Sequence, residues 1–165
     1  MTTKLLLGMI LAASIAAAQT KVTGTITCGK PDKQNSVDVG DKAGHVIVLQ
    51  QSKCKWTKPM EFDGVATKED SVTFTVEQNG EQTTTSGFGW MTLANGDNML
   101  VRLQAKGTAK GAEMNDEGKW TIRRATGKLR GITGSGTYKC KGTSESLTCE
   151  AEGEYQKGKA AEKKK

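Results

Sequence analysis

The amino-acid sequence predicts an all-β protein, a small antiparallel up-and-down β-barrel of about eight strands. Its 165 residues suffice for one domain, and apolar and polar residues alternate along most of the chain. Twenty Gly, only two Pro and few aromatic residues (three Trp, two Tyr, three Phe) are typical of strands joined by tight turns. Sequential antiparallel strands hide their edges by closing into a barrel or by packing as two sheets. Glycines inside the strands favour the barrel, and a two-sheet sandwich is the alternative.

Residues 1–18 have the organisation of a secretory signal peptide. Lys4 supplies the positive start, the apolar run 5–16 follows, and the residues at 16–18 match an A-x-A cleavage site. The run of about a dozen residues is shorter than the roughly 20 that a transmembrane helix needs. We therefore expect cleavage and an exported chain starting at Gln19, periplasmic or extracellular, with no transmembrane segment.

The positive charge is concentrated at the C-terminus. Of the formal net charge of +6, the tail 156–165 contributes five Lys and one Glu, and Lys4 lies in the expected signal peptide. Residues 19–155, the expected barrel domain, therefore carry only +1. Nucleic-acid binders carry their basic charge on the folded surface, so we expect no nucleic-acid partner. We expect a disordered Lys-rich tail, with loose attraction to an anionic envelope surface as the alternative.

Four strands are expected in the N-terminal half of the domain. Residues 22–28 alternate apolar or small residues with three threonines, which predicts a strand with one buried face. A loop at 31–35 precedes a short strand at 37–39. Residues 45–50 form a strand with apolar residues on both faces, and 72–76 alternate again.

The C-terminal half contains the clearest turn signals. The Asn-Gly pairs at 79–80 and 95–96 are hairpin signals, and they bracket an expected strand at 83–93. Residues 99–106 and 119–123 alternate in the same way, with a turn expected at 115–118 and Arg102 expected to face outward.

The end of the domain predicts a β-hairpin with a defined register. Residues 134–141 and 147–155 both alternate, and a polar turn separates them. When Cys140 faces Cys149, Tyr138 lies opposite a small residue and opposite charges meet on the other face. Because one register satisfies all three conditions, we predict a disulfide between these two cysteines.

The pairing of the other two cysteines follows by elimination. Four cysteines in an exported chain favour two disulfides, and the hairpin leaves Cys28–Cys54 as the second. A zinc site would need C-x-x-C spacing, which is missing, and His45 is the sole histidine. We therefore expect no metal and no cofactor.

The segment Thr126–Tyr138 (TGKLRGITGSGTY), followed by Glu152–Tyr155 (EGEY), resembles the closing strands of allene oxide cyclase and dirigent-like barrels. The resemblance covers 118–155, about a quarter of the chain, and implies an antiparallel barrel with an internal ligand cavity. In the cyclases this cavity binds an oxidised fatty acid, and in dirigent proteins it steers phenoxy radicals. Their working residues have no matching positions here, so no role is carried over. Segments 54–59 and 91–97 resemble small exported bacterial proteins of unassigned function.

Three aromatic residues and the histidine form the expected ligand site. Trp120 and Tyr138 lie on apolar strand faces, and Trp90 lies on a strand whose opposite face is nearly bare glycine. If the barrel holds a ligand, these rings should line it, with His45 giving a polar contact at one end or serving only as a structural residue. Large residues beside small ones leave a cavity or fill the core, and the small aromatic set favours a filled barrel.

No catalytic residue is predicted. The sequence lacks a G-x-S-x-G nucleophile elbow, and its Gly-rich segment lacks the G-K-[ST] ending of a phosphate loop. The favoured function is a non-catalytic exported barrel that binds a small apolar or amphipathic molecule or an envelope component. The alternatives are a cofactor-free isomerase or cyclase of the allene oxide cyclase type, and a structural or partner-binding envelope protein with a filled core. A cavity of about 300 Å³ or more would support the two functions that need a ligand, whereas a filled interior would leave only the structural or partner-binding protein. The sequence leaves the oligomeric state open.

Overall fold

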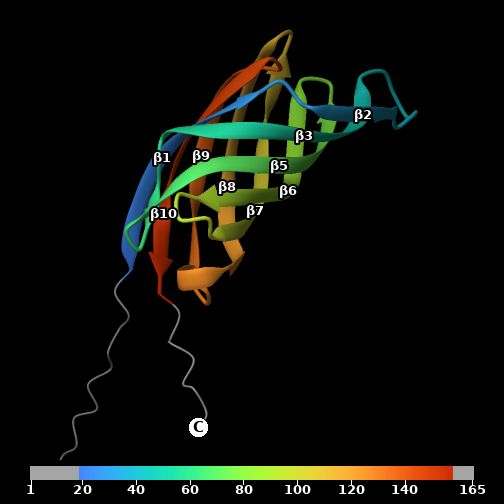
Figure 1. Ribbon diagram of the computed structural model, residues 1–165. Coiled ribbons are helices and arrows are strands. Elements are labelled where there is room, and N and C mark those ends of the chain that lie inside the picture. The colour runs from blue at the N-terminus through green and yellow to red at the C-terminus, as the bar shows by residue number, and fades with distance from the viewer. Residues whose placement is uncertain (1–18, 158–165) are drawn as a thin grey trace, which may run out of the picture.

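The structure is a computed structural model that describes residues 19–157. Within that range the chain is all-β and forms a closed antiparallel barrel, with one 3-10 turn, η1 (Gly127–Leu129), as its only helical element (Figure 1). The expected signal peptide at 1–18 and the last eight residues of the expected tail lie outside the described residues. None of the helical segments described is long and apolar enough to span a membrane.

Eight strands of the described chain form the closed wall, each hydrogen-bonded to two neighbours. They are β1 (Thr20–Gly29), β3 (His45–Lys58), β5 (Val65–Asn79), β6 (Gln82–Leu93), β7 (Asn98–Lys110), β8 (Glu113–Ala125), β9 (Thr133–Thr143) and β10 (Ser146–Gln156). Around the wall the order is β1-β10-β9-β8-β7-β6-β5-β3, and β3 pairs back onto β1. Two short strands are added, β2 (Lys33–Asp38) beside β3 and β4 (Glu61–Phe62) beside β5. The predicted fold class is confirmed.

Strand β3 closes the barrel because it is long enough to pair with three strands. It pairs with β5 from His45 to Lys55, while its last residues pair with β1. The Cys28–Cys54 disulfide joins β1 to β3 at this closure, as predicted. Beside the first half of β3, β2 takes the place of β1, and all six of its residues are exposed. In Figure 1, β2 and the adjoining end of β3 project sideways from the barrel.

The C-terminal hairpin has the predicted register. Cys140 faces Cys149 across β9 and β10, and a disulfide joins them. In the same register Tyr138 lies opposite Ala151. The local alternation of small, large and charged residues is therefore sufficient to set this pairing.

The turn expected at 115–118 is wrong, because those residues belong to β8. The connection lies earlier, between β7 and β8, where Gly111 has a φ of +60°. Gly118 instead makes room inside the sheet, since a Cβ there would lie 2.7 Å from the Tyr138 hydroxyl oxygen. Gly118 is therefore required by the close approach of the Tyr138 ring and does not mark a turn.

The interior of the barrel is packed most tightly at the end near the two termini. Met60, Phe62 and Leu93 are almost completely buried there, and they belong to the larger of the two core clusters. The Phe62 ring packs against Tyr155 with 5.3 Å between centroids, and the Tyr155 hydroxyl accepts a hydrogen bond from the Asp63 backbone N–H at 2.8 Å. A second cluster surrounds the two disulfides.

Candidate functional site

A cavity of about 320 Å³ lies inside the barrel. Its rim includes Pro31, Ala112 and Ser144, from the β1–β2 connection and the β7–β8 and β9–β10 turns, which lie at the end away from the termini (Figure 1). Met60 and Phe62 line the cavity at the tightly packed end of the barrel near the two termini, which is its closed end. The cavity therefore opens at one end of the barrel.

The expectation of a filled barrel is wrong. The inner faces of β6 and β7 carry small side chains at the cavity, Thr83, Thr85 and Ala105. The large apolar residues are concentrated at the closed end, so the open half of the barrel remains hollow.

Trp120 lines the cavity, on the inner face that the alternation predicts. The residue is only 6% exposed, and its indole N–H donates a hydrogen bond to the Glu152 carbonyl at 3.1 Å. Glycines on β9 and β10 make room for the ring, because a Cβ on Gly136 would lie 2.6 Å from Trp120 Cε2. The indole is therefore held in place and presents an apolar surface to the cavity.

Tyr138 also lines the cavity, and it packs over a glycine of β8. Burial, and secondarily the negative charge of nearby Asp116, raise the pKa of the Tyr138 phenol. The phenol therefore stays neutral at physiological pH and keeps its O–H group as a hydrogen-bond donor.

Trp90 lies outside the cavity, on the outer face of β6. The residue is 38% exposed, and the Arg124 guanidinium lies 5.8 Å from the centroid of its ring. Gly87, Gly89 and Met91 point inward instead. The face of β6 that carries the two glycines thus lies toward the interior, where a Cβ on Gly87 would collide with the backbone of β5.

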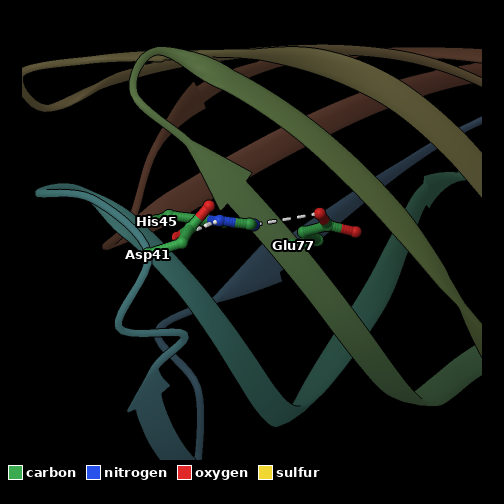
Figure 2. A network of polar contacts seen from close by, with 3 residues as sticks. All are labelled: Asp41, His45 and Glu77. Atoms are coloured by element: carbon green, nitrogen blue, oxygen red, sulfur yellow. Dashed lines mark hydrogen bonds and ion pairs between the residues drawn. The ribbon is translucent and has the colours of Figure 1, made fainter.

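His45 also lies away from the cavity, and its ring bridges two acidic side chains on the surface (Figure 2). Nδ1 lies 2.7 Å from Asp41 Oδ1 and Nε2 lies 3.1 Å from Glu77 Oε1. The hydrogen bond to Glu77, followed by the one to Asp41, raises the pKa of His45 above its ordinary value. This network joins the β2–β3 turn to β5.

Asp70, which the sequence pattern did not single out, lines the cavity from β5. The residue is 7% exposed, and its Oδ1 accepts a hydrogen bond from the Trp56 indole N–H at 2.9 Å. Burial raises the pKa of the Asp70 carboxyl to about 7, although the Trp56 hydrogen bond acts in the opposite direction. At neutral pH this carboxyl is therefore balanced between its acid and its carboxylate form.

A second acidic residue, Asp116 of β8, also lines the cavity. Its Oδ1 accepts a hydrogen bond from the Thr83 hydroxyl at 3.1 Å, and burial raises its pKa. A signal for both acids existed. Asp70 continues the inward alternation of 72–76 by one step, and Asp116 lies two steps before Trp120 on the same face. Both residues lie in runs of charged residues, where inner and outer positions are both polar and the alternation of apolar and polar residues cannot be recognised.

The cavity has an acidic character. Among the described residues that line it, Asp70 and Asp116 are the ionisable carboxyl groups, and Lys, Arg and His are absent. The remaining polar lining consists of neutral amides and hydroxyls, including Gln50 and Ser52. The described part of the chain contains no group of three or more His, Cys, Asp or Glu residues placed to hold a metal ion. The cavity can therefore accept hydrogen bonds and positive charge, and it offers no basic side chain to an anion.

No protein-family model matches the chain, and no curated protein matches it significantly. Among solved structures, the chain is similar to a conserved protein of unknown function from Rhodopseudomonas palustris. The TM-score is 0.50 at 6% identity, covering 84% of this chain and 99% of that chain. Two pterocarpan synthase dirigent proteins, GePTS1 and PsPTS1, give TM-scores of 0.49 and 0.48, each at 12% identity. They cover 92% and 87% of this chain, and 98% and 97% of their own chains. The first similarity supports the barrel fold and carries no function with it.

Proposed function

We propose that this barrel is an exported, non-catalytic binding module that takes up a small, mainly apolar molecule in its cavity. The observation that carries the proposal is the cavity itself, about 320 Å³ and open at one end. This volume is at the lower limit of the range found for small-molecule sites. The hollow half of the barrel gives no support to the alternative of a structural protein with a filled core.

The chemistry of the wall suits a ligand with an apolar body. Trp56, Trp120 and Tyr138 line the cavity together with the inward-facing disulfides. Both indole N–H groups already have partners within the protein, so the tryptophans offer mainly apolar ring surface. Burying apolar surface stabilises a complex by about 25 cal/mol per Å².

The compartment follows from the cysteines. All four cysteines are disulfide-bonded. Disulfides persist in oxidising compartments and are rare in the cytosol, which supports export to the periplasm or the medium. The expected signal peptide at 1–18 also predicts export.

A cofactor-free isomerase or cyclase is the second candidate, and Asp70 favours it. A carboxyl in an apolar cavity with a pKa of about 7 can both donate and accept a proton near neutral pH. If the bound molecule is converted, Asp70→Asn should abolish the conversion and leave the molecule bound. If it is bound unchanged by the wild type, the non-catalytic proposal holds.

Titration with Prodan, a neutral naphthalene dye, tests whether the cavity is the binding site. We expect saturable binding of one dye per chain, with the blue-shifted emission of an apolar environment. Thr85→Leu, which fills the cavity from the inner face of β6, should weaken binding at least tenfold. The matched control is Thr84→Leu, whose side chain points outward on the same strand. Equal affinity in both variants would place the dye elsewhere and contradict the proposal.

A further inference from the structure

The charge of the cavity lining indicates which class of small molecule the barrel takes. We propose that the ligand is an amphipathic amine, whose protonated amino group pairs with the Asp70 carboxylate and whose apolar body packs against Trp56 and Trp120. The proposal rests on the proposed function and narrows it, because it assigns the polar end of the ligand to a particular side chain.

Asp70 has one oxygen available for a ligand. Its Oδ1 is held by the Trp56 indole N–H, and no other described side chain donates a hydrogen bond to this carboxyl group. Every buried side-chain oxygen of the described residues has a hydrogen-bond partner, so Oδ2 must retain some open surface. Because Asp70 lines the cavity, that surface faces the cavity. A hydrogen-bond donor on a bound molecule would therefore find Asp70 Oδ2 available.

A cation fits this position better than a neutral or an anionic group. A carboxylate held away from water is costly unless an opposite charge or several donors pair with it. The lysines next to the inner-face positions do not supply that charge, since Lys53, Lys55 and Lys119 are exposed on the outer surface. An ammonium group would do so from within the cavity. A carboxylate ligand would add a like charge and find no basic partner there.

Two other features of the cavity favour a cation. Asp116 lines the cavity three residues after the start of β8, close to the open rim, so negative charge extends from the entrance toward the interior. The aromatic rings of Trp56, Trp120 and Tyr138 line the same space. The faces of such rings attract cations, most strongly where water is excluded.

Calorimetric titration of the full chain with octylamine, 1-octanol and octanoate at pH 7 tests the proposal. The three probes have equal apolar chains, so their affinities differ only through the headgroup. We expect octylamine to bind at least tenfold more tightly than octanol, and octanoate to bind most weakly. Asp70→Asn should remove the advantage of the amine while leaving octanol unchanged. The matched control is Glu69→Gln, an exposed acid next to Asp70 on β5.

The outcomes separate this proposal from the proposed function. If the three probes bind equally, or if Asp70→Asn leaves the preference for the amine intact, the amine proposal is overturned while small-molecule binding stands. If Prodan binds in a Thr85-dependent way and octylamine does not bind, the amine class is wrong. If neither Prodan nor any octyl probe enters the cavity, both proposals fail. Unchanged octanol binding shows that Asp70→Asn keeps the fold.

Discussion

The indole N–H of Trp56 donates a hydrogen bond to Asp70 Oδ1, with 2.9 Å between the two heavy atoms. The contact joins β3 to β5 on the inner wall of the barrel, where Asp70 lies opposite Cys54 in the strand register. One neutral donor offsets only part of the free-energy cost of burying a carboxylate. The pKa of Asp70 therefore remains raised to about 7 despite this hydrogen bond.

Asp70→Asn should stabilise the protein at alkaline pH and have little effect at acidic pH. The folded-state pKa of about 7 exceeds the ordinary 3.8, so the folded chain holds an extra proton between these values. Asp70 therefore lowers the free energy of unfolding as pH rises from about 4 to about 7, by on the order of 4 kcal/mol. Asn mimics the protonated acid and can still accept the Trp56 hydrogen bond. Urea unfolding at pH 4.5 and pH 8 measures the difference, and a gain that is the same at both values would contradict this account.

Trp120→Ala should lose stability and Prodan binding together, whereas Trp90→Ala should lose neither. Trp120 is 6% exposed and lines the cavity, while Trp90 is 38% exposed on the outer surface. Truncating a buried aromatic residue costs about 3–5 kcal/mol, and an exposed one costs much less. Unfolding and dye titration of both variants test whether Trp120 lies on the inner face of the barrel and Trp90 on the outer face. Loss of dye binding in Trp90→Ala would show that the outer surface of β6 contributes to the site.

The two disulfides should contribute unequally to stability. Cys28–Cys54 spans 26 positions in sequence and Cys140–Cys149 spans nine. The chain-entropy relation assigns about 3.5 kcal/mol to the longer loop and about 2.6 kcal/mol to the shorter one. Paired Cys→Ala variants, compared by urea unfolding, should therefore rank in that order. A larger loss from opening the short hairpin would mean that local packing, rather than loop entropy, dominates.

His45→Gln should destabilise the protein at acidic pH and have little effect at alkaline pH. The pKa of His45 is raised by Glu77 first and then by Asp41, and Lys42 is a further charged group of the same turn. A raised folded-state pKa means that the stabilisation is fully present below pH 6.5 and is lost as pH rises through the folded-state value.

Melting temperatures at pH 5.5 and pH 9 measure the effect of His45→Gln, and the histidine ring protons report the pKa directly by NMR. Glu77→Gln should produce the same pH dependence, because it removes the first of the two partners. Prodan binding should be unaffected. If His45→Gln weakens dye binding at constant stability, the histidine is a ligand contact after all.

The barrel and much of its pairing could be predicted from the sequence, because both depend on short-range patterns. The C-terminal hairpin shows this most clearly, since one register aligns Cys140 with Cys149 and Tyr138 with Ala151. The outward position of Arg102 also follows from the polarity of its neighbours, and the structure places its guanidinium over the exposed Phe88 ring. Strand periodicity is a property of consecutive residues, so the sequence alone carries it.

The faces of glycine-rich and charged segments were decided by the tertiary structure. Trp90 lies on the outer face of β6, opposite an inner face where a Cβ on Gly87 would collide with the β5 backbone, and no local pattern contains that contact between strands. Asp70 and Asp116 turn inward because the alternation continues through charged runs once each strand is held by two neighbours.

The cavity itself follows from closure of the barrel. Its volume is what remains after all eight strands have placed their inner side chains, with large residues at one end and small ones at the other. The sequence alone therefore predicts most of the strands, the C-terminal hairpin register and the disulfides, but not the true extent of β2 and β8. Only the closed barrel decided which side chains share the interior, because that depends on the packing of residues far apart in the chain.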